Sequence, residues 1–315
     1  MSHDHGHSHD HGAHVHGVHA HGHAPQNFGK AFATGIALNL GFVVIEAAYG
    51  LMSNSVALLA DAGHNLGDVL GLGVAWLASI LALRAPTARF TYGMRGSSIL
   101  AALFNAVFLL VVVGGLSWEA LRRLGSPEPV GGKTMMAVAA VGIVVNAVTA
   151  WLFASGRKQD LNLRGAFLHM ASDALVSIGV VAAGLVILLT GWLWLDPLVS
   201  LVINGVIVWG TWGLLRDSLG MSMAAVPPQI DPAAVRQFLL SRTGVVAVHD
   251  LHIWSMSTTE NALTCHLVMP AGHPGDAFLH ELARDFARRF KIIHTTVQIE
   301  VDPHMACALA PDEVV

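Results

Sequence analysis

The chain has 315 residues, of which 54% are hydrophobic and only 12% charged, and its formal net charge is −4. Soluble domains average about 25% charged residues, so this composition excludes an ordinary soluble protein and indicates a membrane protein. The basic residues form no patch large enough for nucleic acid. Two cysteines, Cys265 and Cys307, are too few for a disulfide-stapled secreted fold.

The first segment, residues 1–29, is rich in histidine. It has no Lys or Arg before Lys30 and carries ten histidines between His3 and His23, mostly in the spacing His-x-His. It lacks apolar periodicity and the apolar core of a secretory signal peptide. We expect a disordered cytoplasmic tail whose imidazoles collect zinc, cobalt, nickel or copper weakly. A purification tag is the alternative, but the histidines are mixed with Asp, Gly and Ser.

Six apolar runs follow the tail. Each has about 20 residues or more, which is enough to cross a hydrocarbon core about 30 Å thick. The runs cover residues 31–52, 55–83, 98–121, 134–155, 165–190 and 192–215. They predict a six-helix transmembrane domain over residues 30–218 in the cell's inner (plasma) membrane.

The charges between the runs predict the orientation of this domain. Cytoplasmic segments carry an excess of Lys and Arg in membrane proteins. If the N-terminus is cytoplasmic, the cytoplasmic segments hold Lys30, Arg84, Arg89, Arg95, Arg157, Lys158, Arg164 and Arg216, and the external loops hold Arg122, Arg123 and Lys133. We therefore expect both termini in the cytoplasm.

A small soluble domain is expected over residues 228–304, followed by a flexible tail over 305–315. Asp231-Pro232 is typical of a helix start, and the helix should end near Ser241. Alternating apolar residues predict strands over 245–255, 262–269 and 292–301, and a helical period predicts a helix over 276–290. The order αββαβ indicates a ferredoxin- or metallochaperone-like α+β domain. Its core is small, so dimerisation would stabilise it.

Two pairs of potential metal ligands lie inside the apolar runs. His64 and Asp68 are four residues apart, and so are His169 and Asp173. That spacing places both members of a pair on one face of a helix. A carboxylate in lipid is costly unless it is paired or faces a cavity. Two imidazoles and two carboxylates together suit tetrahedral Zn²⁺ and also admit Co²⁺.

Other polar residues in the runs have less certain roles. Asp61 precedes His64 by one turn and could be a proton relay or a structural partner. Structural hydrogen bonding between helices is the better interpretation for the membrane asparagines. Glycines recur every four residues at Gly63, Gly67 and Gly71, which favours close helix packing.

The intramembrane residues favour metal exchange over other activities. Histidine changes its charge near neutral pH, and metal binding displaces protons from such ligands, so the site could exchange a divalent ion for protons. A metal-binding membrane sensor or a passive channel remains an alternative. An intramembrane zinc enzyme is less favoured, because four protein ligands leave no open position for catalysis.

The soluble domain holds a second group of potential ligands. These are His249, His252, His266, His280, Glu300 and Asp302. They could converge on one face of the domain, although any one of them, and His252 in particular, could be a simple surface residue.

Several stretches of this sequence resemble the cation diffusion facilitator family of divalent-metal/proton antiporters, in particular its zinc-efflux branch. The resemblance covers about residues 30–305. In the membrane region the matching stretches are SVALLADAGH (55–64), RFTYG (89–93) and LNLRGA (161–166), the last of which leads to His169 and Asp173. In the soluble domain they are HDLHIW (249–254) and VQIE (297–300).

The resemblance implies specific roles for these residues. It implies a transport site at His64, Asp68, His169 and Asp173, with the first histidine associated with zinc preference over cadmium. It also implies a cytoplasmic binuclear site at His249, His266 and Asp302, with His280 at the bridging position. Glu300 stands where some members have histidine. The loop 84–95 lacks His and Asp, so a third site found in some members is expected to be absent. The resemblance further implies a homodimer that exports Zn²⁺, with Co²⁺, Ni²⁺ or Cd²⁺ as further candidates and no organic cofactor.

Overall fold

The computed structural model describes residues 30–154, 161–302 and 307–310, so the predicted His-rich tail lies outside the described residues. Six long helices come first in the chain. They are α1 (Lys30–Met52), α2 (Val56–Ala82), α3 (Ser97–Gly125), α4 (Gly132–Ala154), α5 (Leu161–Thr190) and α6 (Leu195–Ser222). At 1.5 Å per residue each is roughly 35–45 Å long, which is enough to cross a bilayer.

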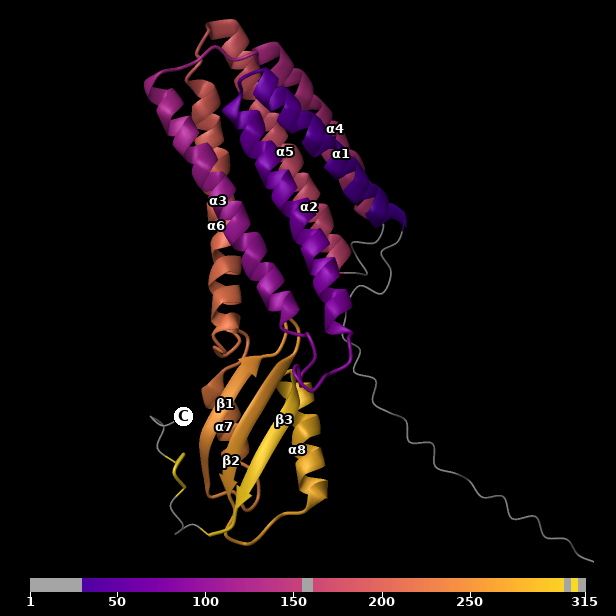
Figure 1. Cartoon of the computed structure of the whole chain (residues 1–315), viewed down its shortest axis with the longest axis vertical. Helices are drawn as coiled ribbons and strands as arrows, with labels where there is room; N and C mark the ends of the chain where they lie inside the picture. Colours follow the sequence, from indigo (N-terminus) through magenta and orange to yellow (C-terminus); the bar gives the residue numbers. More distant parts are fainter. Residues whose placement is uncertain (1–29, 155–160, 303–306, 311–315) are drawn as a thin grey trace, which may run out of the picture.

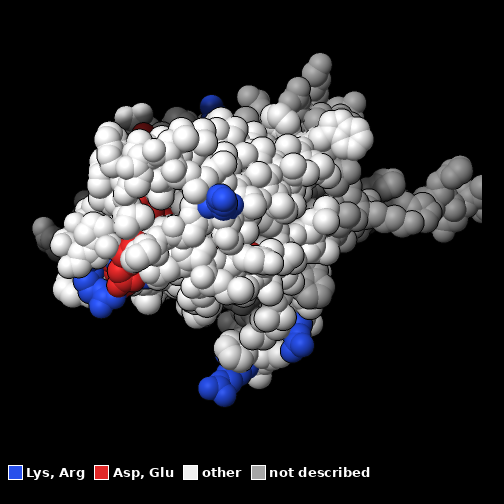
Figure 2. Space-filling model, turned by 90° about the horizontal axis from the view of Figure 1, so that it is seen from above, with Lys and Arg blue, Asp and Glu red and all other residues white. Residues whose placement is uncertain are grey.

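The predicted membrane domain is confirmed. Within the described residues, four stretches are long and apolar enough to span a membrane: Ser97–Gly125, Gly132–Trp151, His169–Thr190 and Leu195–Ser222. The described apolar part of α1, Ala37–Met52, is shorter. Large apolar side chains such as Val111, Trp151 and Trp209 are exposed on the bundle. The end of the bundle seen in Figure 2 is mostly uncharged, with a few acidic and basic groups. The exposed apolar side chains of the bundle suit lipid rather than water.

The helices pack as an elongated bundle with close neighbours (Figure 1). Helix α4 packs against α5, α3 against α6, and α2 against α3. The buried core includes Phe42 of α1, Leu58 of α2, Met135 of α4 and Val180 of α5. The same core also includes residues of α3 and α6, so all six helices meet around one apolar centre.

The regularly spaced glycines of α2 pack against α3. A Cβ added at Gly67 would lie 2.7 Å from Leu109 Cδ1, and one added at Gly71 would lie 2.7 Å from Asn105 Nδ2. Real Cβ atoms do not come so close to a neighbour. The glycines therefore allow the close helix packing expected from the sequence, and the helix they face is α3.

Helices α4 and α5 come even closer, because two glycines face each other. A Cβ at Gly184 would lie 2.6 Å from Met136 Cγ and 3.2 Å from the carbonyl oxygen of Gly132. A Cβ at Gly132 would in turn lie 3.3 Å from the carbonyl oxygen of Gly184. An added side chain at Gly184 would therefore push the Met136 side chain aside and also press on the backbone of α4.

Replacing Gly184 with valine should therefore destabilise the bundle. Overpacking of this kind costs about 1–3 kcal/mol, and thermal unfolding of the full chain in detergent would show it. Gly179→Val is the matched control, because Gly179 lies on the same helix and has nothing within 4 Å of its added Cβ. Equal melting temperatures for the two variants would contradict this account of the α4–α5 contact.

The C-terminal domain has the predicted order αββαβ. Its elements are α7 (Pro232–Leu240), β1 (Ala247–Ser255), β2 (Asn261–Val268), α8 (Asp276–Arg289) and β3 (Ile292–Glu300). The sheet order is β1-β2-β3, with β1 antiparallel and β3 parallel to β2. The parallel pair requires a crossover connection, which α8 provides. Phe238, Leu263 and Phe286 are among the buried residues of its core.

Helix α7 begins where the sequence predicts. Asp231 is the N-cap, and its side chain accepts a hydrogen bond of 2.9 Å from the Ala233 N–H. Pro232 occupies the first helical position, where its missing N–H costs nothing.

The C-terminal domain contacts the connection between α2 and α3 (Figure 1). Arg95 Nη1 lies 2.7 Å from Glu260 Oε2, and the Thr258 N–H donates to Ser98 Oγ at 3.1 Å. The rings of Tyr92 and His294 meet edge to face, with centroids 5.3 Å apart. The turn between β1 and β2 is therefore docked on the segment that follows α2.

Candidate metal sites

The structure brings together the four intramembrane residues that the sequence singled out. His64 and Asp68 lie on α2, and His169 and Asp173 lie on α5. Asp68 Oδ2 is 3.6 Å from His64 Nε2 and 3.0 Å from His169 Nε2. Asp173 is 3.4 Å from His64 Nε2 through Oδ1 and 3.7 Å from His169 Nε2 through Oδ2. The four side chains form a closed ring in which each imidazole faces both carboxylates.

The dimensions of this ring suit a tetrahedral cation. Nitrogen and oxygen ligands about 2.0–2.1 Å from Zn²⁺ lie roughly 3.3 Å from one another in a tetrahedron. The observed separations of 3.0–3.7 Å bracket that value. The ligand atoms of His64, Asp68 and His169 all lie within 4.8 Å of one another. Asp173 is not in that group, so its carboxylate would have to move closer for all four residues to hold one cation.

Burial of the ring also favours a cation. Asp173 is 1% exposed, and its Oδ2 atom is buried without a hydrogen-bond partner among the described residues. His64 Nδ1 is buried and unpartnered in the same part of the chain. A buried carboxylate without sufficient partners is costly in an apolar surrounding. A bound divalent cation would remove that cost at Asp173.

Asp61 lies outside the ring and takes part in a layer of helix-to-helix contacts. Its Oδ2 accepts a hydrogen bond of 3.2 Å from Ser177 Oγ of α5. Asn65 Nδ2 donates to Glu46 Oε2 of α1 at 3.3 Å. These contacts join α2 to α5 and to α1 within a turn of His64. Asp61 therefore has a hydrogen-bond partner on α5, which supports a structural role.

The start of α2 is held by a residue that the sequence did not single out. Asp196, at the start of α6, is fully buried. It accepts hydrogen bonds from Ser55 Oγ at 2.5 Å, from the Val56 N–H at 2.8 Å and from the Ala57 N–H at 3.3 Å. Ser55 Oγ in turn accepts from the Leu58 N–H. Since the first N–H groups of a helix lack partners within it, Asp196 fixes the end of the helix that carries His64 and Asp68.

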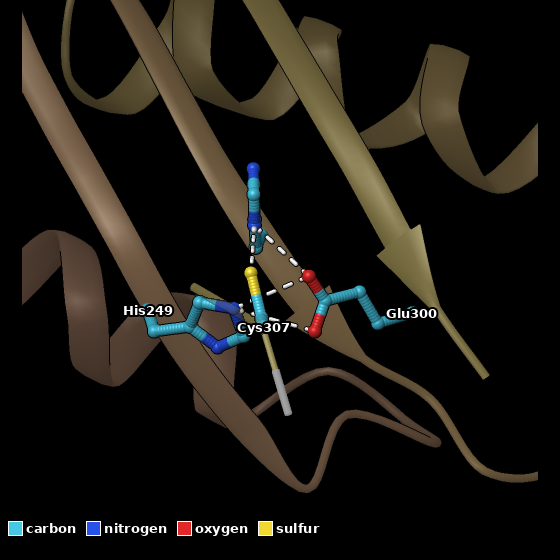
Figure 3. Close-up of side chains that lie close together, drawn as sticks. His249, Glu300 and Cys307 are labelled. Carbon is cyan, nitrogen blue, oxygen red and sulfur yellow. Dashed lines mark hydrogen bonds and ion pairs between the residues drawn. The ribbon is translucent and has the colours of Figure 1, made fainter. Parts of the chain in front are cut away.

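A second group of ligand atoms lies at one end of the C-terminal sheet (Figure 3). His249 of β1 and His266 of β2 are directly paired across the strands. Glu300, the last residue of β3, lies 3.3 Å from His249 Nε2 and 3.0 Å from His266 Nδ1. Cys307 Sγ lies 3.7 Å from His266 Nδ1. Ligand atoms of all four lie within 4.8 Å of one another.

The other predicted residues of this domain lie elsewhere. His280 is exposed on α8, and Asp302 lies two residues beyond the end of β3. Neither belongs to the four-residue group found among the described residues. His252 contacts Asp250, with its Nε2 2.9 Å from Asp250 Oδ1. The structure thus brings three of the six predicted ligands together and adds Cys307, which was not among them.

Electrostatics at this second group favour an ionised carboxylate. Burial alone would raise the pKa of Glu300, but a hydrogen bond with Cys307 and the neighbouring His249 and His266 lower it below its usual value. The other cysteine differs, since burial, with a smaller contribution from Asp250, raises the pKa of the Cys265 thiol to about 12. Glu300 is therefore available as an anionic oxygen ligand, whereas Cys265 stays a neutral thiol.

Two family models together match nearly all of the described chain. Residues 33–221 match the cation efflux transmembrane domain, and residues 227–302 match the cytoplasmic domain of cation efflux proteins. The first match contains the ring on α2 and α5. The second contains His249, His266 and Glu300 and ends before Cys307.

Curated relatives resemble the chain over most of its length. The cation efflux system protein CzcD of Alcaligenes sp. (strain CT14) is 36% identical over 299 residues, which is 95% of this chain and 90% of that protein. The zinc transporter ZitB of Escherichia coli (strain K12) is 35% identical, covering 96% and 94%. A cadmium, cobalt and zinc/H(+)-K(+) antiporter of Bacillus subtilis (strain 168) is 34% identical, covering 87% and 90%. These names describe transport of metal cations, and they describe no enzyme.

Proposed function

Because the chain belongs to the cation efflux family, a family of membrane transporters of divalent metals, we propose that it exports Zn²⁺ from the cytoplasm in exchange for protons. The observation that carries this proposal is the ring of two imidazoles and two carboxylates between α2 and α5. Four ligands with a net charge of −2 suit a divalent cation that must bind and then leave.

Zinc is the cargo that the ligands favour. Zn²⁺ has no geometric preference of its own and accepts nitrogen and oxygen ligands in a tetrahedron. Co²⁺, Ni²⁺ and Cd²⁺ remain further candidates, because the choice among such metals depends more on geometry and supply than on affinity. The names of the relatives include zinc in two cases and cadmium and cobalt in one.

Proton exchange follows from the chemistry of the histidines. A metal binds the neutral imidazole, so His64 and His169 must release any proton before they can act as ligands. The relative from Bacillus subtilis is named as an antiporter that uses protons. A proton arriving at either histidine from the acidic side of the membrane would weaken metal binding and favour release there.

The arrangement of the ligands suggests how access could alternate. Each helix carries one His/Asp pair at a four-residue spacing, so α2 and α5 each hold half of the ring. A shift of one helix against the other would separate the halves and lower the affinity. The inner carboxylate, Asp173, would stay buried while the more exposed Asp68 and His169 admit the ion.

We further propose that the protein works as a homodimer in the inner membrane with both termini in the cytoplasm. The chain enters α1 and leaves α6 at the end of the bundle where the C-terminal domain lies (Figure 1). The excess of Lys and Arg in the segments at that end favours a cytoplasmic location. Zn²⁺ reaching the C-terminal domain would then act as a regulatory ion.

Transport in proteoliposomes would test this function. With Zn²⁺ on the side of the C-terminal domain and a more acidic opposite side, we expect Zn²⁺ to move toward the acid while protons move back. Collapsing the pH gradient with an ionophore should slow the metal flux. Zinc flux that is unaffected by the gradient would indicate a channel, and binding without flux would indicate a sensor.

The pH dependence of metal binding gives a further prediction. Protons compete with the metal for the imidazoles of His64 and His169, so the zinc affinity of the ring should fall as the pH drops. The fall should reach up to about tenfold per histidine for each pH unit. Isothermal titration of a variant lacking residues 1–23, with His249→Ala and His266→Ala to silence the second group, would measure it. An affinity that stays constant between pH 7.5 and 5.5 would contradict proton exchange at these ligands.

A further inference from the structure

Cys307 lies beside the ligand atoms of His249, His266 and Glu300, at the end of the C-terminal sheet (Figure 3). It follows β3 by seven residues, and its half-buried side chain points back toward His266 and Glu300. Its Sγ atom lies within 4.8 Å of the ligand atoms of His249, His266 and Glu300. The Cys307 carbonyl accepts a hydrogen bond of 3.1 Å from the Ala310 N–H, within a turn that the structure describes. The thiol thus faces the strand ends that carry the other three ligands.

The orientation of His266 is independent support for a metal at this position. Its Nε2 atom lies 3.3 Å from Asp250 Oδ2, whereas its Nδ1 atom faces Glu300 and Cys307. A hydrogen bond donated by the Nε2–H of His266 to Asp250 would leave the lone pair of Nδ1 directed at the cluster. A carboxylate that fixes a ligating histidine in this way is a common feature of metal sites.

Asp250 itself occupies an unusual backbone position. Its φ is +49°, in the left-handed region, and it lies where the pairing of β1 and β2 skips from His249 to His252. Residues other than glycine adopt such a conformation at a cost, typically at bulges and functional sites. Here the bulge turns the Asp250 carboxylate toward both His252 and His266.

The second cysteine of the chain cannot take this role. Cys265 precedes His266 on β2, so its side chain points to the opposite face of the sheet. It is 1% exposed and packs in the apolar core of the domain. Of the two cysteines of the chain, only Cys307 can therefore supply a thiolate on this face of the sheet.

We infer that Cys307 Sγ is the fourth ligand of a cytoplasmic metal site, with His249, His266 and Glu300, that is complete within one protomer. The donor set is two nitrogens, one oxygen and one sulfur. A thiolate favours Zn²⁺ and Cd²⁺ over hard ions such as Mg²⁺ and Mn²⁺. The inference depends on the proposed function only for the identity of the bound metal, which is taken to be one that the transporter carries. It assigns neither His280 nor Asp302 to this site.

Cobalt spectroscopy of the full chain tests the inference directly. Co²⁺ bound to a thiolate gives a sulfur-to-cobalt charge-transfer band in the near ultraviolet, which histidine and carboxylate ligands do not give. We expect the band in the wild type and in Cys265→Ala, and we expect Cys307→Ser to lose it while keeping the visible cobalt bands. A band that persists in Cys307→Ser, or that never forms in the wild type, would overturn the assignment.

A second measurement does not depend on cobalt. Zn²⁺ should protect Cys307 from alkylation, and protection should be lost in His249→Ala. Cys307→Ser should also weaken zinc binding at this site at least roughly tenfold, since outer partners of a metal alone account for 10–100-fold. Equal alkylation rates with and without Zn²⁺ would contradict a metal–sulfur bond.

The transport proposal can be separated from this one by a variant of the membrane ring. Asp173→Asn leaves the C-terminal domain untouched, so it should keep the cobalt–sulfur band even where it transports no metal. A variant that transports normally but shows no such band would leave the exporter intact and remove Cys307 from the site.

Discussion

Replacing Asp173 with asparagine should abolish zinc transport. Asp173 is the most buried member of the ring, and its carboxylate contacts both His64 and His169. Asparagine keeps the shape but removes the negative charge that balances the cation. Loss of one partner of a buried charge pair costs about 3–5 kcal/mol, so metal affinity should fall at least about 100-fold. Initial rates of zinc flux in proteoliposomes would measure the effect.

A matched control keeps this test from depending on folding alone. Asp217→Asn makes the same chemical change on α6, where the side chain is 40% exposed and paired with Arg216. This variant should transport like the wild type. Asp173→Asn should elute as the wild type does in size-exclusion chromatography and keep its melting temperature without metal. Wild-type flux in Asp173→Asn would remove the ring from the transport mechanism.

Replacing Asp196 with alanine should destabilise the membrane bundle by about 3 kcal/mol or more. The change leaves three buried donors without an acceptor, namely Ser55 Oγ and the N–H groups of Val56 and Ala57. Each unsatisfied buried group costs about 1–3 kcal/mol. Thermal unfolding in detergent should show a lower melting temperature for Asp196→Ala. The melting temperature of Asp196→Asn should lie between those of the wild type and Asp196→Ala, because its amide oxygen can still accept hydrogen bonds.

An exposed helix cap provides the comparison for Asp196. Asp231 caps α7 through one hydrogen bond to the Ala233 N–H and lies at the surface. Asp231→Ala should therefore cost only about 1 kcal/mol. If the two alanine variants lose equal stability, burial is not what gives Asp196 its importance.

Hydropathy and periodicity located the helices well but not all of their ends. The fifth helix begins at Leu161, as expected if it extends beyond the bilayer core. The third helix continues to Gly125, past the apolar run that ends at 121. Arg122 and Arg123 remain helical there because both pair with Glu119 of the same helix. Backbone hydrogen bonding does not stop where the apolar side chains stop, so hydropathy underestimates such a helix.

The intramembrane site was accessible from sequence because its residues are costly in lipid. An aspartate in a membrane helix is costly unless it has a partner or a function, and two His/Asp pairs at helical spacing indicated one shared metal site. Cys307 and Asp250 gave no such signal. Both are ordinary in a soluble domain, and their roles depend on the path of the chain after β3 and on a bulge in β1. Asp196 also lies in an apolar run, but no histidine, cysteine or second acidic residue at helical spacing accompanies it, and its partners lie about 140 residues earlier in the chain.

The division of the ring between α2 and α5 has a consequence for biosynthesis. His64 and Asp68 enter the bilayer about a hundred residues before His169 and Asp173 are synthesised. Until the fifth helix arrives, a nascent chain holds only one imidazole and one carboxylate of the ring, too few ligands to retain a transition metal firmly. High affinity for the cargo therefore arises late, when the newly inserted α5 docks against α4 and α2. The half-ring of an incompletely assembled chain would therefore not bind a metal ion firmly.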